Sequence, residues 1–586
     1  MGAHAPVDSE PNQRGTEVKV ASAVASFLES VGLTHVFGVS GGASLHLIHG
    51  VSDNGKLKFV PTTTETTAGY AADAYARING LGCAMATSGP GASNLITAIA
   101  TSYYDSVPVI YITGNCATFR SSEKLGVRQY GFQEMDIVSM VRGITKYARK
   151  VIFPRDIGIS LKEAVREALS GRKGPVLIDI PDDIQRSDIE EQIFEDLEVR
   201  KLPEVTGIHM SLMSVLLRDS KRPVFIFGAG CDVASMWKFA FFCTIPFVRS
   251  WGAVDMVKGL FNMGCFGTHG SRAANLIVQN ADLIVCVGCR LDTKATADPK
   301  TFGRKAKLVM VDIDPNEFHK FDHLDRPVLT KIFADSHSFL DAITKEPFIS
   351  CLPSRDWLNY CSNLLNAFPT QPTWEGWNPY TALHHLGKEI SEDAIIVSDT
   401  GNTLGWVMQA YPFKGERFIH AFNNTPMGYG IPAALGAALS SNGTPVVLFT
   451  GDGSAMMSLA ELATIAYHKL PVTVILLDNK GHGMCRQTQR QWLGGKYPST
   501  SIEGGLAFPE DWGECLASLG FNVFDDPEQA VHFDGPAASV IKVPPEAHLI
   551  PQARFGQPIE DADPLLPWDE FTKHMIIDPL PRRHYE

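Results

Sequence analysis

Apolar runs of strand length alternate with amphipathic stretches in three segments of the chain. In the first segment, "THVFGVSGG", "GCAMATSG", "VPVIYITG" and "GPVLIDIP" predict buried strands, and "TTAGYAADAYARI" predicts a helix. The second segment predicts strands at "RPVFIFGAG", "ADLIVCVGCR" and "KLVMVDIDP", and the third at "DAIIVSDTG", "TPVVLFTGDG", "PVTVILLDN" and "ASVIKVP". Alternating strands and helices are typical of parallel sheets covered by helices. We therefore predict an α/β fold with three doubly wound parallel-sheet domains.

Charged or proline-containing links separate the segments, near "FEDLEVRKLPEV" and "KEPFISCLPSRD". They predict domains at residues 16–190, 205–345 and 370–550. A polar, flexible tail is expected at residues 1–15, and an extended arm packed on the surface is expected at residues 551–586. The first and third segments have similar length and style, which favours a duplicated sheet.

Composition excludes several classes of protein. The net charge is -13 and no Lys/Arg cluster is longer than "PRRH", so a nucleic-acid partner is not expected. The longest apolar stretches fall short of the about 20 residues that a membrane helix needs. The N-terminus has no hydrophobic signal core, so we expect a cytoplasmic protein. The pair "CVGC" lies in a buried-strand pattern without a second pair, and therefore predicts reduced core cysteines.

The stretch "VVLFTGDGS" places Asp452 at the end of a predicted strand, where open α/β sheets bind ligands. Gly451 and Gly453 allow a tight turn, and amides at the next helix start can face a phosphate. Asp452 would repel that phosphate unless a cation such as Mg²⁺ lies between them. Asn479 ends the next strand and offers a second oxygen, and Gly481 in "NKGHG" can add a carbonyl. An isolated GDG would favour a simple turn with Asp as helix cap, but the pairing with Asn479 favours a metal site. "SLAELATIAYHKL", between the two, is expected to be helical.

The "GDG", the 27-position separation of Asp452 and Asn479, and "LLDNKGHGM" resemble the thiamin diphosphate (ThDP) motif of the acetolactate synthase-like superfamily. This resemblance implies that Asp452, Asn479 and Gly481 hold a Mg²⁺ ion that carries the cofactor's diphosphate. It also implies that Met427 props ThDP into its bent shape, although a routine core role is the alternative. The other cofactor-binding residues implied are Gly401, Asn402 and Thr403 in "SDTGNT", and Gly451, Gly453, Ser454, Gly483 and Met484.

Glu65, in "KFVPTTTETTAGYAADAYARING", matches the family pattern E-x-x-A-x-x-A-A-x-x-Y-A-R. "TSGPGASNLITAIATSYYDSVPVIYITG" continues the match. The resemblance implies that Glu65 hydrogen-bonds N1' of the cofactor's aminopyrimidine and so promotes proton loss from C2. The alternative is an ordinary acid at a helix start. In this family the pyrimidine-binding domain of one subunit faces the diphosphate-binding domain of another, which implies a homodimer or homotetramer with active sites between subunits.

The resemblance favours carboligases over simple decarboxylases, which place histidines over the cofactor. Residues 115–135 contain no His, and "GFQEMDI" is similar to the Phe-Gln-Glu of acetolactate synthases. Phe132 and Gln133 would then border the reacting carbon. His482 is equally consistent with proton donation and with a positioning role.

The central segment is similar to the flavin-binding domain of acetolactate synthases, through "GCFGTHGSRAAN" and "VGCRLD". The resemblance implies FAD contacts at Thr268, His269 and Gly270, although relatives have lost flavin while keeping the fold. Arg290 would hold the carboxylate of the second keto acid, because a buried arginine fork suits a carboxylate. The alternative is an arginine tied to Asp292 or to FAD.

Two departures from the family pattern concern the acceptor. Thr488 stands where acetolactate synthases usually carry Trp, and "IPDD" replaces the usual "IPKD" at residues 180–183. An altered acceptor pocket is therefore expected, as in related enzymes that add an acetyl unit to ketones, including keto-sugars.

These observations together predict a ThDP- and Mg²⁺-dependent enzyme with FAD as a further cofactor. It would decarboxylate pyruvate, or a related 2-oxo acid, and join the acyl unit to a second small carbonyl compound. The alternatives are a 2-oxo acid decarboxylase, a flavin-linked oxidase and a catalytically silent homologue. The intact Glu65, Asp452 and Asn479 weigh against the last of these.

Overall fold

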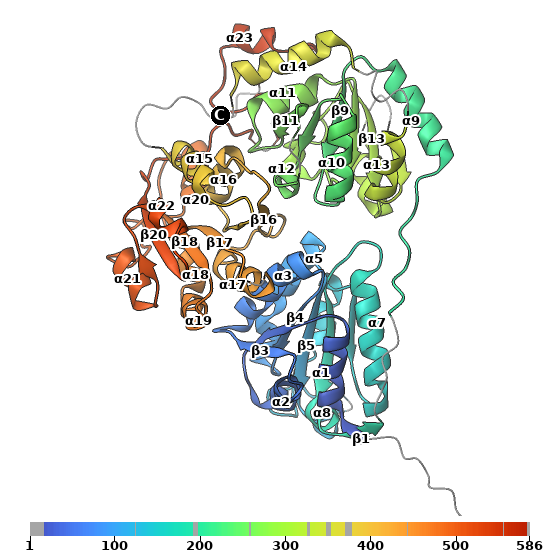
Figure 1. The fold of residues 1–586 in the computed structure, drawn as a ribbon, viewed down its shortest axis with the longest axis vertical. Coiled ribbons are helices and arrows are strands. Elements are labelled where there is room, and N and C mark those ends of the chain that lie inside the picture. Colours follow the sequence, from blue (N-terminus) through green and yellow to red (C-terminus); the bar gives the residue numbers. More distant parts are fainter. Residues whose placement is uncertain are drawn as a thin grey trace, which may run out of the picture. The chain divides into compact units, whose positions relative to one another are not determined.

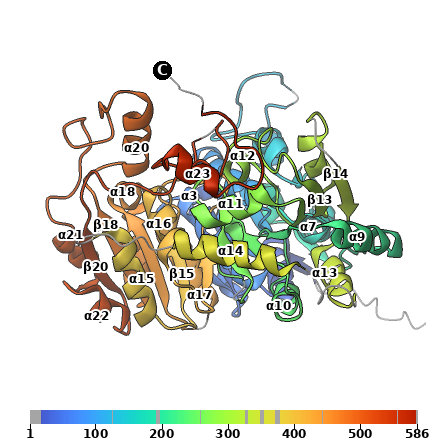
Figure 2. The same cartoon turned by 90° about the horizontal axis from the view of Figure 1, so that it is seen from above.

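The computed structural model describes residues 17–123, 125–190, 197–256, 259–324, 329–346, 353–369, 378–441, 443–554 and 556–582. These residues form two compact units: the first covers most of the chain up to Val199, and the second covers the chain from Arg200 together with the short segments Arg77–Asn79 and Ser170–Lys173. The first unit contains one six-stranded sheet and the second contains two (Figures 1 and 2). The prediction of three parallel-sheet α/β domains is confirmed. The predicted tail at residues 1–15 lies outside the described residues, and the domain boundaries stay predictions.

The sheet of the first unit has the strand order β3-β2-β4-β5-β7-β6, with all pairs parallel. The central strands are buried on both faces, which explains why their sequences read as continuous apolar runs. A short antiparallel pair joins β1 (Glu17–Lys19) to β8 (Asp188–Glu190). The sheet strands are β2 (His35–Gly38), β3 (Lys58–Pro61), β4 (Gly82–Ala86), β5 (Val109–Asn115), β6 (Tyr147–Lys150) and β7 (Val176–Pro181). The helices are α1 (Val20–Ser30), α2 (Leu45–Asp53), α3 (Glu65–Asn79), α4 (Pro90–Asn94), α5 (Ile96–Asp105), α6 (Ile137–Val141), α7 (Ile157–Leu169) and α8 (Asp182–Gln185).

The last sheet of the second unit repeats this topology. Its order is β16-β15-β17-β18-β20-β19. If the six strands of each sheet are numbered along the chain, both sheets have the spatial order 2-1-3-4-6-5. This agreement supports the predicted duplication. The strands are β15 (Ile395–Ser398), β16 (Arg417–Ile419), β17 (Val446–Gly451), β18 (Val472–Asp478), β19 (Asn522–Val523) and β20 (Ala537–Lys542). The helices are α15 (Pro379–Glu389), α16 (Asn402–Ala410), α17 (Gly430–Ser440), α18 (Asp452–Ser458), α19 (Glu461–Tyr467), α20 (Gly483–Trp492), α21 (Trp512–Ser518) and α22 (Pro527–Val531).

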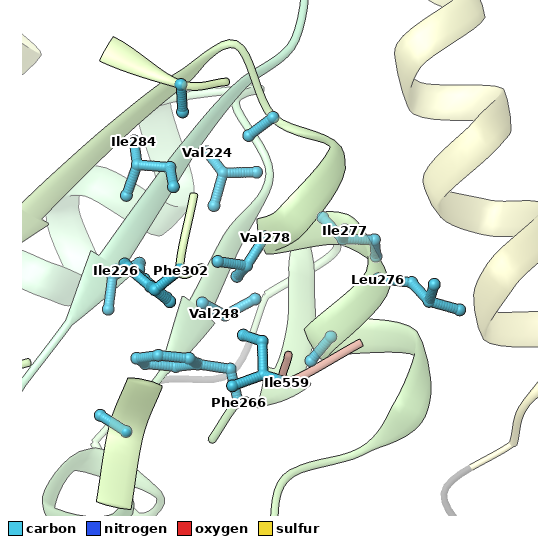
Figure 3. Packing of buried hydrophobic residues seen from close by; sticks show 14 of the residues in the cluster. Val224, Ile226, Val248, Phe266, Leu276, Ile277, Val278, Ile284, Phe302 and Ile559 are labelled. Carbon is cyan, nitrogen blue, oxygen red and sulfur yellow. The ribbon is translucent and has the colours of Figure 1, made fainter. Parts of the chain in front are cut away.

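The middle sheet has the order β11-β10-β9-β12-β13-β14 and is covered on both faces. Alternate residues of β9 point to opposite faces: Val224 and Ile226 pack with α11 and α14, and Phe225 and Phe227 pack with α9, α10 and α13 (Figure 3 shows part of the first core). The strands are β9 (Pro223–Phe227), β10 (Phe247–Arg249), β11 (Asn262–Cys265), β12 (Leu283–Val287), β13 (Lys307–Asp312) and β14 (Leu329–Phe333). The helices are α9 (Gly207–Asp219), α10 (Val233–Phe242), α11 (Arg272–Asn280), α12 (Thr293–Thr296), α13 (Ser336–Thr344) and α14 (Arg355–Ala367).

Two sequence predictions can be compared directly with these elements. The helix expected at residues 458–470 is interrupted, because α18 ends at Ser458 and α19 covers only Glu461–Tyr467. Cys286 and Cys289 of "CVGC" are buried free thiols, as predicted. In the part of the chain that the structure describes, no helix combines the length and the apolar character needed to cross a membrane.

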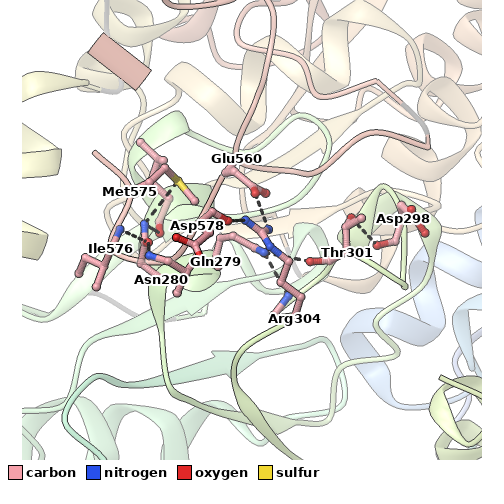
Figure 4. Close-up of polar contacts among 12 residues, drawn as sticks. Gln279, Asn280, Asp298, Thr301, Arg304, Glu560, Met575, Ile576 and Asp578 are labelled. Carbon is pink, nitrogen blue, oxygen red and sulfur yellow. Dashed lines mark hydrogen bonds and ion pairs between the residues drawn. The ribbon is translucent and has the colours of Figure 1, made fainter. Parts of the chain in front are cut away.

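The chain after residue 551 is more deeply packed than the surface arm that we predicted. Ile559 and Phe571, the latter in α23 (Trp568–Lys573), are buried in the core between the middle sheet, α11 and α14 (Figure 3). A buried ion pair joins Arg304 to Glu560 at 2.6 Å, and Arg304 also donates to the Asp578 carbonyl at 2.7 Å (Figure 4). The arm thus completes the middle domain instead of covering it.

Asn280, at the end of α11, is the polar centre of this packing (Figure 4). Its side-chain nitrogen donates to the Tyr360 hydroxyl at 2.8 Å and to the His574 carbonyl at 3.2 Å. Its side-chain oxygen accepts hydrogen bonds from the backbone nitrogens of Ile576 at 2.6 Å and Ile577 at 3.2 Å. One buried amide therefore fixes the arm to both α11 and α14.

We expect Asn280→Ala to loosen the arm, because the substitution leaves the backbone N–H groups of Ile576 and Ile577 without their partner. Each unsatisfied buried group costs about 1–3 kcal/mol, so the melting temperature should fall by several degrees. Limited proteolysis should cleave within residues 551–582 earlier than in the unchanged protein. Asn363→Ala, on the exposed side of the neighbouring α14, serves as the control and should have little effect. Equal melting temperatures and cleavage rates for the two variants would contradict the role of Asn280.

Candidate active site

The predicted metal-binding residues meet at one edge of the last sheet. Strand β17 ends at Gly451, which pairs in parallel with Leu477 of β18. Asp452 and Asn479 therefore follow the carboxyl ends of two neighbouring strands at the same sheet edge, and both side chains are buried. The position predicted for the pair from strand ends is the one that the structure gives.

The Asp452 carboxylate ties the start of α18 to the turn before α20. Its Oδ1 accepts a hydrogen bond from the Gly453 nitrogen at 2.7 Å, and its Oδ2 accepts one from the Gly481 nitrogen at 3.1 Å. Burial and the neighbouring Asp478 carboxyl raise the pKa of Asp452 to about 7. A cation beside this carboxylate would favour its charged form.

Two buried amide oxygens at this edge accept no hydrogen bond from the residues that the structure describes: Oδ1 of Asn479 and Oδ1 of Asn402. The two side chains converge on Gly483, where an added Cβ would lie 2.5 Å from Nδ2 of Asn479 and 2.8 Å from Nδ2 of Asn402. Buried polar atoms are nearly always paired in folded proteins. The residues therefore suit a bound group that carries positive charge or hydrogen-bond donors.

Asp399 is a further residue of this site, and the sequence analysis missed it. It follows β15 and is fully buried; its Oδ1 accepts hydrogen bonds from the nitrogens of Thr400 at 2.8 Å and Gly428 at 3.2 Å. Its Oδ2 accepts one from the Gly430 nitrogen at 2.8 Å, and the Ser454 side chain is a fourth partner. Burial raises the pKa of Asp399. An acid directly after a predicted strand, as in "IIVSD", is the signal that could have found it.

Asp399 holds together three loops that carry predicted cofactor-binding residues. One loop contains Gly401, at a φ of +82°, and leads into α16. Another precedes α17 and contains Met427, and the third is the start of α18. Thr403 lies close to Gly451, because a Cβ on this glycine would be 3.4 Å from the Thr403 hydroxyl oxygen. The loops that carry these predicted diphosphate-binding residues therefore lie close together at this sheet edge.

Met427 and His482 both lie against Gly453. A Cβ on this glycine would be 2.5 Å from Cδ2 of His482 and 3.4 Å from the terminal methyl of Met427. Burial lowers the pKa of His482. His482 precedes the first residue of α20, and its backbone nitrogen donates to the Thr500 carbonyl at 3.0 Å. Met484, the second residue of α20, is partly buried against the core of this domain.

Glu65 belongs to the first unit, where it is the first residue of α3. The Thr64 side chain caps this helix, so Glu65 is not needed for capping. Oε2 of Glu65 accepts a hydrogen bond from Nδ2 of Asn94 at 2.8 Å. A Cβ on Gly91 would lie 3.1 Å from Oε1, so this glycine makes room for the carboxylate. Asn94 was not identified from the sequence, although it lies in the quoted "GPGASN".

The predicted Phe132 and Gln133 lie in a loop of the first unit that Glu134 orders. Phe132 is 85% exposed within this unit, and Gln133 has a φ of +57°. The Glu134 carboxylate accepts backbone hydrogen bonds from Ser122 at 2.7 Å, Tyr130 at 3.1 Å and Gly131 at 3.2 Å, and one from the Ser121 hydroxyl at 3.0 Å. Partial burial acts to raise the pKa of Glu134, but the hydrogen bonds outweigh it and lower the pKa to about 2.

The residues predicted to contact FAD are already engaged within the chain. Thr268 and His269 are buried and bond to each other, with 3.0 Å between the hydroxyl oxygen and Nδ1. Nε2 of His269 lies 3.1 Å from the side-chain nitrogen of Gln552, and a Cβ on Gly270 would be 2.5 Å from the Phe266 backbone. The side chains of Thr268 and His269 are therefore not free to contact a flavin.

Arg290 differs from its predicted setting. We expected a buried side chain, but it is 32% exposed, and its Nε lies 3.7 Å from Oε1 of Glu317. Asp292, which was one alternative partner, caps α12 by accepting a hydrogen bond from the Ala295 nitrogen at 3.0 Å. The loop after β12 leaves Arg290 near the surface, facing an acid 27 residues later in the chain.

Three family models match the chain. They are the thiamine pyrophosphate enzyme N-terminal TPP binding domain at residues 18–140, the central domain at residues 213–343, and the C-terminal TPP binding domain at residues 399–533. The matched ranges contain Glu65, Arg290 and Asp452, one in each domain.

Curated relatives match over most of their length. The chain is 32% identical to the acetolactate synthase large subunit of Corynebacterium glutamicum, over 85% of this chain and 81% of the relative. It is 30% identical to the acetolactate synthase isozyme 1 large subunit of Escherichia coli, over 92% of this chain and 96% of the relative. It is 33% identical to the acetolactate synthase isozyme 2 large subunit of Escherichia coli, over 81% of this chain and 85% of the relative. The chain therefore belongs to the thiamine pyrophosphate enzyme family and is similar to acetolactate synthase large subunits.

Proposed function

We propose that this protein decarboxylates pyruvate, or a related 2-oxo acid, and joins the resulting acyl unit to a second carbonyl compound. The single observation that carries the proposal is the edge formed by Asp452 and Asn479, where a buried carboxylate lies beside a buried amide oxygen that accepts no hydrogen bond from the described residues. The similarity to relatives named acetolactate synthase supports joining of the acyl unit to a second carbonyl compound as the reaction.

We propose ThDP with Mg²⁺ as the bound group at this edge. Asp452 and Asn479 would hold Mg²⁺ through side-chain oxygens and Gly481 through its carbonyl, and the start of α18 at Gly453 and Ser454 would lie beside the diphosphate. The described residues contain no cluster of three His, Cys, Asp or Glu side chains set to bind a metal. Mg²⁺ suits the site because it commonly takes one or two protein groups and completes its shell with phosphate oxygens and water. When bound, ThDP supplies the electron sink for decarboxylation.

Glu65 would hold a proton at N1' of the aminopyrimidine. Asn94 fixes one oxygen of its carboxylate, and Gly91 leaves space at the other. We propose that Glu65 of one subunit serves the diphosphate site of a partner in a homodimer or homotetramer, as the family resemblance implies. The cytoplasmic location also stays a prediction from the sequence.

Met427 and His482, over Gly453, would contact the cofactor from the diphosphate side. Met427 would support its bent shape, and His482 would donate a proton or position a neighbouring group. Phe132 and Gln133 would border the reacting carbon, and the lack of His in residues 115–135 favours carboligation over protonation. Arg290 stays a predicted contact for an acceptor carboxylate, in competition with Glu317. FAD also stays a prediction, and because Thr268 and His269 are already bonded we assign it no catalytic step.

Glu65→Gln should abolish most product formation, because the amide keeps the size of the side chain but cannot stabilise the N1' proton. We expect a loss of about 100-fold or more in kcat. Glu17→Gln, which changes an exposed acid of β1, is the control and should retain full activity. The measurement is CO₂ release and product mass with ThDP, Mg²⁺ and pyruvate. Product formation by Glu65→Gln at the unchanged rate would contradict the mechanism.

Removal of Mg²⁺ by a chelator should stop the reaction, and Asp452→Asn should raise the Mg²⁺ concentration needed for half-maximal activity. We expect an increase of about 10- to 100-fold, because the carboxylate is the charged ligand of the site. Asp534→Asn, at an exposed position of the same domain, is the matched control. An Asp452→Asn enzyme with an unaltered Mg²⁺ requirement would place the metal elsewhere.

The loop that carries Phe132 and Gln133 should lose its order when Glu134 is neutralised. The pKa of Glu134 is lower in the folded protein, at about 2, than its ordinary value of 4.5, so its stabilisation is complete above pH 4.5 and disappears as the pH falls through 2. Glu134→Gln should imitate the acid form at neutral pH. We expect faster amide hydrogen exchange at Ser122, Tyr130 and Gly131, with Glu123→Gln as control. Unchanged exchange at these three amides would show that Glu134 does not order the loop.

A further inference from the structure

A pocket of about 250 Å³ opens between α20 and the segment after β20. Its lining includes Gly483, Arg486, Arg490 and Tyr497 on one side and Glu546 and His548 on the other. The pocket adjoins the candidate active site, because Gly483 is also the residue on which Asn402 and Asn479 converge. Asn402 further donates to the Ala547 carbonyl at 3.4 Å, which joins the second wall to the site.

Positive charge predominates in this pocket. Arg486 and Arg490 are four residues apart in α20, so they share a face of the helix. Arg486 is held in place by a hydrogen bond from Nη1 to the Asn479 carbonyl at 3.1 Å and by the Tyr497 ring, 5.6 Å from its guanidinium carbon. Arg490 is exposed and has no acidic partner among the described residues.

The acidic groups around the pocket do not balance these charges. Among the described residues, Glu546 is the only carboxylate that lines the pocket, while Glu503 interacts with Arg486 and Asp563 with His548 from outside the lining. Nδ1 of His548 donates to the Glu546 carbonyl at 3.0 Å. The ten-residue α20 also begins here, so its N-terminal amides add positive potential.

We propose that this pocket binds a phosphate group of the acceptor substrate, an inference that rests on the proposed function. Two arginines suit a dianion with three oxygens, whereas a carboxylate is satisfied by one arginine fork. The volume lies below that of most whole-ligand pockets, so it fits one charged group of a longer acceptor. The acceptor is then a phosphorylated ketone or aldehyde that extends from the reacting carbonyl to α20.

The test compares dihydroxyacetone phosphate with dihydroxyacetone as acceptors for the protein saturated with ThDP, Mg²⁺ and pyruvate. We expect a higher kcat/KM for the phosphorylated acceptor, and Arg490→Gln should reduce this preference about 10- to 100-fold. Arg490→Lys should restore part of it. Lys496→Gln removes an exposed charge beside Tyr497 that does not line the pocket, and should keep the preference of the unchanged protein.

A second measurement titrates inorganic phosphate at saturating ThDP. We expect phosphate to compete with the acceptor and to bind more weakly to Arg490→Gln. Equal use of the two acceptors, a preference for a carboxylate acceptor of similar length, or competition of phosphate with ThDP would each overturn the proposal. Failure to release CO₂ from pyruvate would contradict the proposed function alone, and the phosphate titration of Arg490→Gln would then still decide the pocket's role.

Discussion

A single buried carboxylate organises the loops that would hold the cofactor. Asp399 is fully buried and receives hydrogen bonds from the backbone of Gly428 and Gly430, just after Met427, and from the loop that leads to Gly401. In a low-dielectric interior such donors need a partner, and an ionised acceptor provides the strongest one. The loops therefore keep their shape together. This interdependence explains how short, glycine-containing loops from three strand ends can present a site of defined geometry.

The repeated sheet topology places acidic side chains at the same edge of both sheets, beyond the carboxyl ends of the strands. Glu65 follows β3, Asp399 follows β15 and Asp452 follows β17, so each acid lies just beyond the carboxyl end of a parallel strand. Parallel strands bring these ends to one edge, and the helices that follow supply amides facing the same way. One sheet thus carries a carboxylate suited to proton chemistry, and the other carries a carboxylate and amides suited to a metal and phosphates. The middle sheet, with another strand order, lacks such a set of acids at the predicted flavin motif.

The sequence predicted those parts of the fold and site that depend on local patterns. Strands buried on both faces were found because they are continuous apolar runs, whereas the short edge strands β6, β16 and β19 were missed. The common position of Asp452 and Asn479 at one sheet edge was predicted because strand ends bring them together. Asn94 and Arg290 show the limit. The partner of Asn94 is 29 residues away and that of Arg290 is 27, and neither spacing follows from a helix or strand period.

Helix α20 couples the candidate pocket to the C-terminal arm. Gln487 and Gln491 are four residues apart and both donate to the side-chain oxygen of Gln552, whose nitrogen lies beside His269. Arg486 and Arg490 precede these glutamines by one residue each and line the pocket. Gln487 lines the same pocket as the two arginines and also fixes this part of α20 to the arm. Because the arm is anchored in the core of the middle domain, the orientation of the two arginines depends on packing far from the site.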